Sequence, residues 1–142
     1  MAQLKLIEVR DLIGSILPEY NSLIYSNTIN RDNPTSIGVF TAPESRMGNT
    51  GTFGGEELSP VKKFPINILV RWSDDSSEAE ARANEVYNSL NSLGQNFLIR
   101  LQDYNSIKIS FVRMLDSHPV WIGRDDKNIC EYTIRVDFFY YQ

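Results

Sequence analysis

Residues that usually carry catalysis or hold metals are scarce in this sequence. Its 142 residues include one cysteine, Cys130, and one histidine, His118. A single cysteine excludes an internal disulfide, and a lone histidine has no second histidine or cysteine with which to complete a zinc site. No G-x-S-x-G motif is present to expose a serine nucleophile. We therefore expect no enzyme, no cofactor and no metal site, with His118 an ordinary residue of a connecting segment and Cys130 part of the core.

Two other patterns that could carry chemistry have simpler structural interpretations. The segment "MGNTGTFGGEE" is rich in glycine, but it lacks a Lys-Ser or Lys-Thr after the glycines and opens no helix, so neither the phosphate-binding nor the dinucleotide-binding fingerprint is met. The acidic pairs Asp74-Asp75 and Asp125-Asp126 could bind a hard cation. The first pair precedes a predicted helix, where negative charge is favourable, and the second is typical of a turn.

Long apolar runs and an excess of basic residues are also missing. Nowhere are there about 18 consecutive apolar residues, and Lys5, Glu8, Arg10 and Asp11 interrupt the N-terminal segment, so we expect no membrane span and no secretory signal. The formal net charge is −4, which gives no general basic field to attract a phosphate backbone. We expect a cytoplasmic protein that binds no nucleic acid tightly. Its 42% hydrophobic residues suffice for the core of one domain, residues 1–142.

The clearest structural pattern is the segment "ICEYTIRVDFFYYQ", residues 129–142. Its side chains alternate with the period of two that is typical of a strand with one buried side. The odd-numbered side is mostly polar but ends in Phe139 and Tyr141, which we expect to point away from the core. The buried side is formed by the even-numbered residues Cys130, Tyr132, Ile134, Val136, Phe138 and Tyr140.

Two helices are predicted from spacing and from their end signals. The second begins with Ser76 or Ser77 as its N-cap, has acidic residues in its first turn, and ends at Gly94. Its apolar face includes Val86, Leu90 and Leu93. The first covers residues 3–17 and is ended by Pro18. Its apolar stripe comprises Leu4, Ile7, Leu12, Ile13, Ile16 and Leu17.

Four further segments have the composition of strands. Residues 22–29 and 36–42 are β-branched and aromatic, and the turn formers "NRDNPT" between them predict a hairpin. Residues 64–73 and 106–115 alternate between apolar and polar side chains, and residues 116–128 are expected to be a connector. This order favours an α+β fold, a mostly antiparallel sheet of four to five strands with two helices packed on one face.

Residues 43–60, "PESRMGNTGTFGGEELSP", form the longest segment without any period. Four glycines interrupt it, and Pro43 and Pro60 mark its ends. A structureless segment of this length is unusual in a compact domain and is generally either functional or disordered. We expect a flexible loop that becomes ordered in an assembly, where Met47, Phe53 and Leu58 provide apolar anchors.

Taken together, the chain resembles the small tail terminator or tail completion proteins of long-tailed bacteriophages, which are sometimes described as minor capsid proteins. The resemblance spans the whole chain in its layout, with an opening amphipathic helix and a long loop before the strand at residues 64–73. Its most specific parts are "ILVRWSDDSSEAEARANEVYNSL" and "PVWIGRDDKNICEYTIRVDFFYY". The N-terminal third contributes only the order of its helix and strands.

The resemblance implies a ring, usually a hexamer, that caps the head-proximal end of the tail tube, stops its polymerisation and offers a surface to the head connector. Such a protein would assemble in the host cytoplasm and then remain in the virion. Its partners would be further copies of itself, the major tail tube protein, and head connector or neck proteins, while DNA passes through the lumen without specific binding. A head-to-tail ring needs two different contact surfaces. The candidates are in the long loop and the aromatic end of the closing strand: Arg46, Met47, Phe53, Glu56, Glu57, Leu58, Phe139 and Tyr141.

Two alternatives fit the same residues. The first is another phage neck component, such as a head-completion or connector-joining protein, which would share the ring habit. The second is a small hydrolase or ligand-binding domain that uses residues 43–60 as a lid. This second alternative requires a pocket with convergent polar groups and a perturbed acid or base beside the loop.

Overall fold

The computed structural model describes residues 4–42, 61–101 and 106–141. Within these residues, seven strands form one mixed sheet in the order β1-β2-β3-β7-β5-β4, with β6 also paired to β7. All of the pairs are antiparallel except β1 with β2. The strands are β1 (Ile24–Ser26), β2 (Thr35–Thr41), β3 (Val61–Trp72), β4 (Gln95–Arg100), β5 (Ser106–Met114), β6 (Val120–Arg124) and β7 (Cys130–Tyr141).

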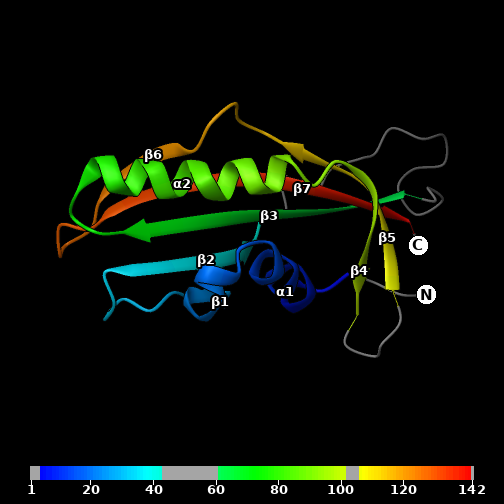
Figure 1. Cartoon of the computed structure of the whole chain (residues 1–142), viewed down its shortest axis with the longest axis horizontal. Helices are drawn as coiled ribbons and strands as arrows, with labels where there is room; N and C mark the ends of the chain where they lie inside the picture. Colours follow the sequence, from blue (N-terminus) through cyan, green and yellow to red (C-terminus); the bar gives the residue numbers. More distant parts are fainter. Residues whose placement is uncertain (1–3, 43–60, 102–105, 142) are drawn as a thin grey trace.

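Two α-helices lie on one face of this sheet. Helix α1 (Leu6–Ile16) packs near β1 and β2, and helix α2 (Ser76–Asn91) packs on β3 and β7 (Figure 1). A short 3-10 helix, η1 (Pro18–Leu23), follows α1. This arrangement confirms the predicted α+β fold with a mostly antiparallel sheet and helices on one side.

The strands β3 and β7 form the central pair and run along the length of the molecule (Figure 1). They are antiparallel over twelve residue pairs, from Val61 with Tyr141 to Trp72 with Cys130. The other edge of β7 is shared, because β6 pairs with its first residues and β5 pairs with its last ones. Three strands therefore depend on β7 for their place in the sheet.

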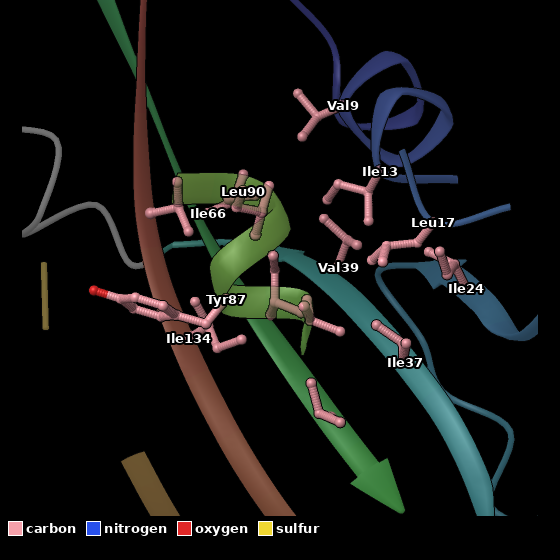
Figure 2. Packing of buried hydrophobic residues seen from close by; sticks show 14 of the residues in the cluster. Val9, Ile13, Leu17, Ile24, Ile37, Val39, Ile66, Tyr87, Leu90 and Ile134 are labelled. Atoms are coloured by element: carbon pink, nitrogen blue, oxygen red, sulfur yellow. The ribbon is translucent and has the colours of Figure 1, made fainter. Parts of the chain in front are cut away.

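The core lies between the helices and the sheet (Figure 2). Val9 and Ile13 of α1 and Leu90 of α2 are fully buried, and they meet alternate residues of the strands, such as Val39 and Ile134. The whole even-numbered side of β7 is buried, as its alternation predicts, and Cys130 is part of this core.

The predicted helices are confirmed, with one correction at an N-terminus. Helix α1 begins after Lys5, whose amide donates to Glu8 Oε1 at 2.9 Å, and Pro18 opens η1. Helix α2 is capped by Asp75, not by Ser76 or Ser77. The Asp75 carboxylate accepts from the amides of Ser77 and Glu78 at 2.9 and 3.4 Å. A carboxylate at this position also suits the positive end of the helix dipole.

The predicted hairpin of residues 22–29 and 36–42 is wrong. Residues 22–23 belong to η1, and β1 pairs with β2 in parallel, with Ile24 opposite Ile37. Asn27 takes a left-handed backbone conformation, with φ of 57°, and its amide donates to Val39 O at 2.7 Å. The chain leaves the sheet at this turn. It then returns to the end of the sheet at which β1 began, and β2 starts there, so that the two strands run in the same direction.

The interpretation of residues 116–128 as a connector is also wrong in part, because β6 lies within it, and β4 was not predicted. Both strands contain a residue with positive φ, Asn96 at 58° and Gly123 at 136°. The pairing of β6 shifts register between Trp121 and Gly123. These irregularities interrupt the alternation by which a short strand is recognised in a sequence.

Gly38 allows β2 to pass close to the backbone of residue 28. A Cβ at Gly38 would lie 2.8 Å from Thr28 O and 2.5 Å from the Phe40 ring. We therefore expect Gly38→Ala to lower the free energy of unfolding by about 1–3 kcal/mol, measured by urea denaturation. Gly14→Ala is the control, because its Cβ would meet side-chain atoms of Asn21 and Arg10 and no backbone, and because alanine favours a helix. Equal stability of the two variants would contradict this interpretation.

Candidate interaction surfaces

The predicted contact residues fall into two groups. Phe139 and Tyr141 are on the odd-numbered side of β7, opposite α1 and α2, which we call the helix-free face. Phe139 is buried but does not belong to the core cluster beneath the helices, so the predicted direction of its side chain is confirmed. The other candidates lie outside the described residues: Arg46, Met47, Phe53, Glu56, Glu57 and Leu58.

Aromatic rings gather on the helix-free face where β5 pairs with the end of β7. The rings of Phe111 and Phe139 are stacked, with centroids 4.3 Å apart and planes inclined by 13°. Phe139 is 9% exposed, whereas Phe111 is 37% and Tyr141 38% exposed. Phe139 therefore supports the surface from below, and Phe111 and Tyr141 present it to solvent.

Two cations accompany these rings. Lys108 Nζ lies 5.5 Å from the centre of the Tyr141 ring, and the Arg113 guanidinium lies 5.2 Å from that of Phe139. Arg113 also forms an ion pair of 2.7 Å with the buried carboxylate of Asp137. These contacts hold both cations beside the aromatic rings. We call this surface the basic aromatic patch, comprising Lys108, Phe111, Arg113, Phe139 and Tyr141.

A β-bulge in β5 creates the patch. Ile109 pairs with Tyr140 on the side of the helices, and the register then shifts so that Phe111 pairs with Phe139 on the helix-free face. The sequence predicts the strand and the direction of Phe139 and Tyr141. It does not predict that Lys108, Phe111 and Arg113 join them, because this depends on the pairing of β5 with β7 and on the bulge.

A second exposed aromatic surface lies at the other end of β7. Trp121 of β6 is 47% exposed, and its ring meets that of Tyr132 edge to face with centroids 5.2 Å apart. Burial and the nearby negative charge of Glu80 on α2 raise the pKa of Tyr132. We call Glu80, Trp121 and Tyr132 the acidic tryptophan patch. Sequence reasoning misses it because residues 116–128 are interpreted as a connector, although the apolar run Val120, Trp121 and Ile122 within that segment is a usable signal.

The acidic pair at Asp125-Asp126 forms a turn, as predicted, and Asp125 is also tied to the sheet. Its carboxylate accepts from the amides of Lys127 and Ile129, both at 2.9 Å, and it binds the buried guanidinium of Arg71 at 2.7 and 2.8 Å. Arg71 also donates to Asn33 O. Burial alone would raise the pKa of Asp125, but these hydrogen bonds and the Arg71 charge outweigh it and lower the pKa below its ordinary value.

A groove of about 240 Å³ lies between α1 and β4. Its polar groups are already engaged locally, because Glu8 accepts from the Lys5 amide, Asp11 pairs with Arg10, and the Ser15 hydroxyl donates to Leu12 O. No nucleophile there is bonded to a base. The lining residues are Glu8, Asp11, Leu12, Ser15, Leu98 and Ile99.

Other features that could indicate chemistry or membrane insertion were also sought. In residues 4–42, 61–101 and 106–141, no three His, Cys, Asp or Glu side chains are grouped so that they could hold a metal ion. The described helices include none with the length and hydropathy needed to cross a membrane. His118 is exposed, and its Nδ1 lies 2.8 Å from Pro119 O.

Comparison with known proteins identifies the family. No match was found among curated proteins. A family model described as bacteriophage tail terminator protein matches residues 19–141, from η1 to the end of β7, and so includes both patches. The family is structural and non-enzymatic, and membership implies a virion component that contacts tail tube proteins and acts in ending tube growth. The chain therefore belongs to the bacteriophage tail terminator family.

Proposed function

We propose that this protein forms a ring, with six copies as the family resemblance implies, at the head-proximal end of the phage tail tube. The ring stops polymerisation of the tube and presents a joining surface to head connector and neck proteins. The observation that carries this proposal is the family match over residues 19–141. The subunit is one domain of residues 1–142 that assembles in the host cytoplasm before entering the virion.

The two exposed aromatic surfaces support an assembly role. Aromatic residues and arginine are enriched in the centres of protein interfaces, where they contribute most of the binding energy. A ring of identical subunits requires two different surfaces on each copy, and the basic aromatic patch and the acidic tryptophan patch provide such a pair. Residues 43–60 stay a proposed contact on sequence grounds alone.

The net charge of −4 is compatible with a ring through which DNA passes. Carboxylates that face a lumen repel phosphate groups and keep the genome from adhering to the wall. We accordingly propose that DNA crosses the ring without specific binding.

A phage that lacks this protein tests the proposal. We expect tails that grow well beyond the normal length and do not join heads, because nothing stops addition to the tube. Tail lengths are measured in electron micrographs of lysates. Supplying the wild-type protein or His118→Ala from a plasmid should restore normal length and joining, since His118 is exposed and lies outside both patches.

Two other results would contradict the terminator role. Tails of normal length that remain separate from heads would indicate a different neck component that acts only in joining. Tails of normal length that are joined to heads would exclude the assembly role. That result would favour the alternative of a small hydrolase or ligand-binding domain that uses residues 43–60 as a lid.

A further inference from the structure

We propose that, in the assembled ring, the acidic tryptophan patch of one copy docks on the basic aromatic patch of the next copy. This inference rests on the proposed ring, and it names the two surfaces that join neighbouring subunits. Trp121 and Glu80 come from one side of the contact, and Lys108, Phe111 and Arg113 come from the other.

The position of the two patches on β7 suits a head-to-tail contact. Tyr132, which supports Trp121, is near the start of the strand and on the side of the helices, whereas Phe139 and Tyr141 are at its end on the helix-free face. Tyr132 and Phe139 are seven residues apart in this strand, which is about 23 Å at 3.3 Å a residue. The patches are thus at opposite ends and on opposite faces of one rigid strand, so one copy can bind a neighbour on each side.

The chemistry of the patches is complementary. Glu80 brings negative charge to Tyr132, which carries Trp121, while Lys108 and Arg113 bring positive charge to Tyr141 and Phe139. An indole ring is the best aromatic partner for a lysine or arginine cation, and opposite charges favour the correct pairing and reject the wrong one. Docking of two basic patches on each other would place like charges together, so the complementary pairing is favoured over a symmetric one.

The contacts within each patch also limit the entropic cost of binding. The Trp121 ring rests on Tyr132, Phe111 is stacked on Phe139, and Arg113 is held by Asp137. Side chains that are already held in one conformation lose less freedom when a partner arrives. We infer that both patches are organised for contact before the ring forms.

Thiol cross-linking of assembled tails tests the contact. The only cysteine, Cys130, is fully buried, so a cysteine placed beside each patch provides the reactive thiols while the contact residues stay intact. Ser77, one helical turn before Glu80, and Ser106, two residues before Lys108, are both exposed. We expect the double variant Ser77→Cys with Ser106→Cys, treated with a short bismaleimide, to give a ladder of multimers on a denaturing gel. Each single variant should give monomer only, because a head-to-tail contact does not bring identical residues together.

The outcomes separate this contact from the ring itself. Tails of normal length that contain the double variant but give no ladder would overturn the contact while leaving the terminator role intact. A cross-linked dimer from a single variant would show a symmetric contact and would also overturn it. If tails lacking the protein were of normal length and joined to heads, the proposed function itself would fail.

Charge reversal provides a second measurement on the purified protein. We expect Glu80→Lys and Lys108→Glu each to raise the concentration needed for ring formation at least tenfold, and the two changes in one chain to restore much of the loss. Asp11→Lys is the control for net charge, because Asp11 is exposed on α1 and away from both patches. Rings that tolerate Glu80→Lys but not Lys108→Glu would show that the basic aromatic patch contacts a different surface of the neighbouring copy, and would overturn the proposal.

Trp121→Ala tests the aromatic part of the contact, and Ile122→Ala at the neighbouring position is its control. Both side chains are about half exposed, so neither change should unfold the subunit. We expect loss of ring formation only for Trp121→Ala. Equal assembly of the two variants would contradict a central place for Trp121 in the contact.

Discussion

Ile134→Asp should yield no soluble, folded protein. Ile134 is 1% exposed, pairs with Ile68 in the centre of the sheet and lies beneath the helices (Figure 2). Loss of a buried isoleucine side chain costs about 2–5 kcal/mol, and a carboxylate without a partner in an apolar core costs more. Domains are stable by only about 5–15 kcal/mol. Soluble yield and circular dichroism are the measurements.

The same substitution at an exposed strand position is the control for this result. Ile122 of β6 is 54% exposed, and Ile122→Asp should change the urea midpoint only slightly. Ile134→Val should remain folded with a loss of about 0.5–1.5 kcal/mol. Soluble Ile134→Asp protein with an unchanged urea midpoint would mean that the even-numbered side of β7 is not the core side.

Asp125→Asn should have the second largest effect, because it leaves the Arg71 guanidinium without its anion. Arg71 is 1% exposed, and removal of one partner from a buried ion pair typically costs about 3–5 kcal/mol. Urea denaturation at pH 7 measures the loss. The exposed neighbour change Asp126→Asn is the matched control and should cost less than about 0.5 kcal/mol.

The dependence of this loss on pH has a definite sign. The folded-state pKa of Asp125 is below the ordinary value of 3.8, so the unfolded state binds more protons between the two values. The contribution of the carboxylate is therefore fully present above the ordinary pKa and is lost as pH falls toward and through the folded-state pKa. We expect the stability difference between wild type and Asp125→Asn to be constant from pH 5 to 7 and to shrink below about pH 4. A difference that grows in acid would contradict this assignment.

A double-mutant cycle separates the ion pair from other effects of the two residues. If the loss in Asp125→Asn arises because the buried Arg71 guanidinium is left without an anion, Asp125→Asn should cost much less stability in an Arg71→Met background. Additive losses would place the effect in the turn instead, where the same carboxylate accepts from the amides of Lys127 and Ile129.

Sequence patterns predict the elements whose periods are long and unbroken. The first nine residues of β7 alternate between apolar and polar side chains without interruption, and α2 has both an acidic first turn and a glycine after its end. Strand β6 has five residues and a bulge at Gly123, so its period is too short to recognise. The turn formers between β1 and β2 predict a turn, and the structure has one at residues 31–32, but they do not determine that the two strands pair in parallel and not as a hairpin.

Prediction of the candidate surfaces is limited in the same way, because only the local pattern of one strand can be recognised in the sequence. The alternation of β7 places Phe139 and Tyr141 on the helix-free face, which is a local property of one strand. The neighbours that complete the basic aromatic patch come from β5, and the partner of Trp121 comes from β7. Such combinations depend on which strands pair and in what register, and a single sequence does not specify these long-range contacts directly.

The central position of β7 also governs the order in which the fold can form. Its partners β3, β5 and β6 all precede it in the chain, and Val61 pairs with Tyr141 across most of the described sequence. Until β7 has left the ribosome, β3 has an unpaired edge that could join other chains. High contact order of this kind slows folding. We therefore expect the subunit to fold only after translation of β7, so that chaperone supply, more than the intrinsic stability of the domain, should limit its soluble yield during rapid overproduction.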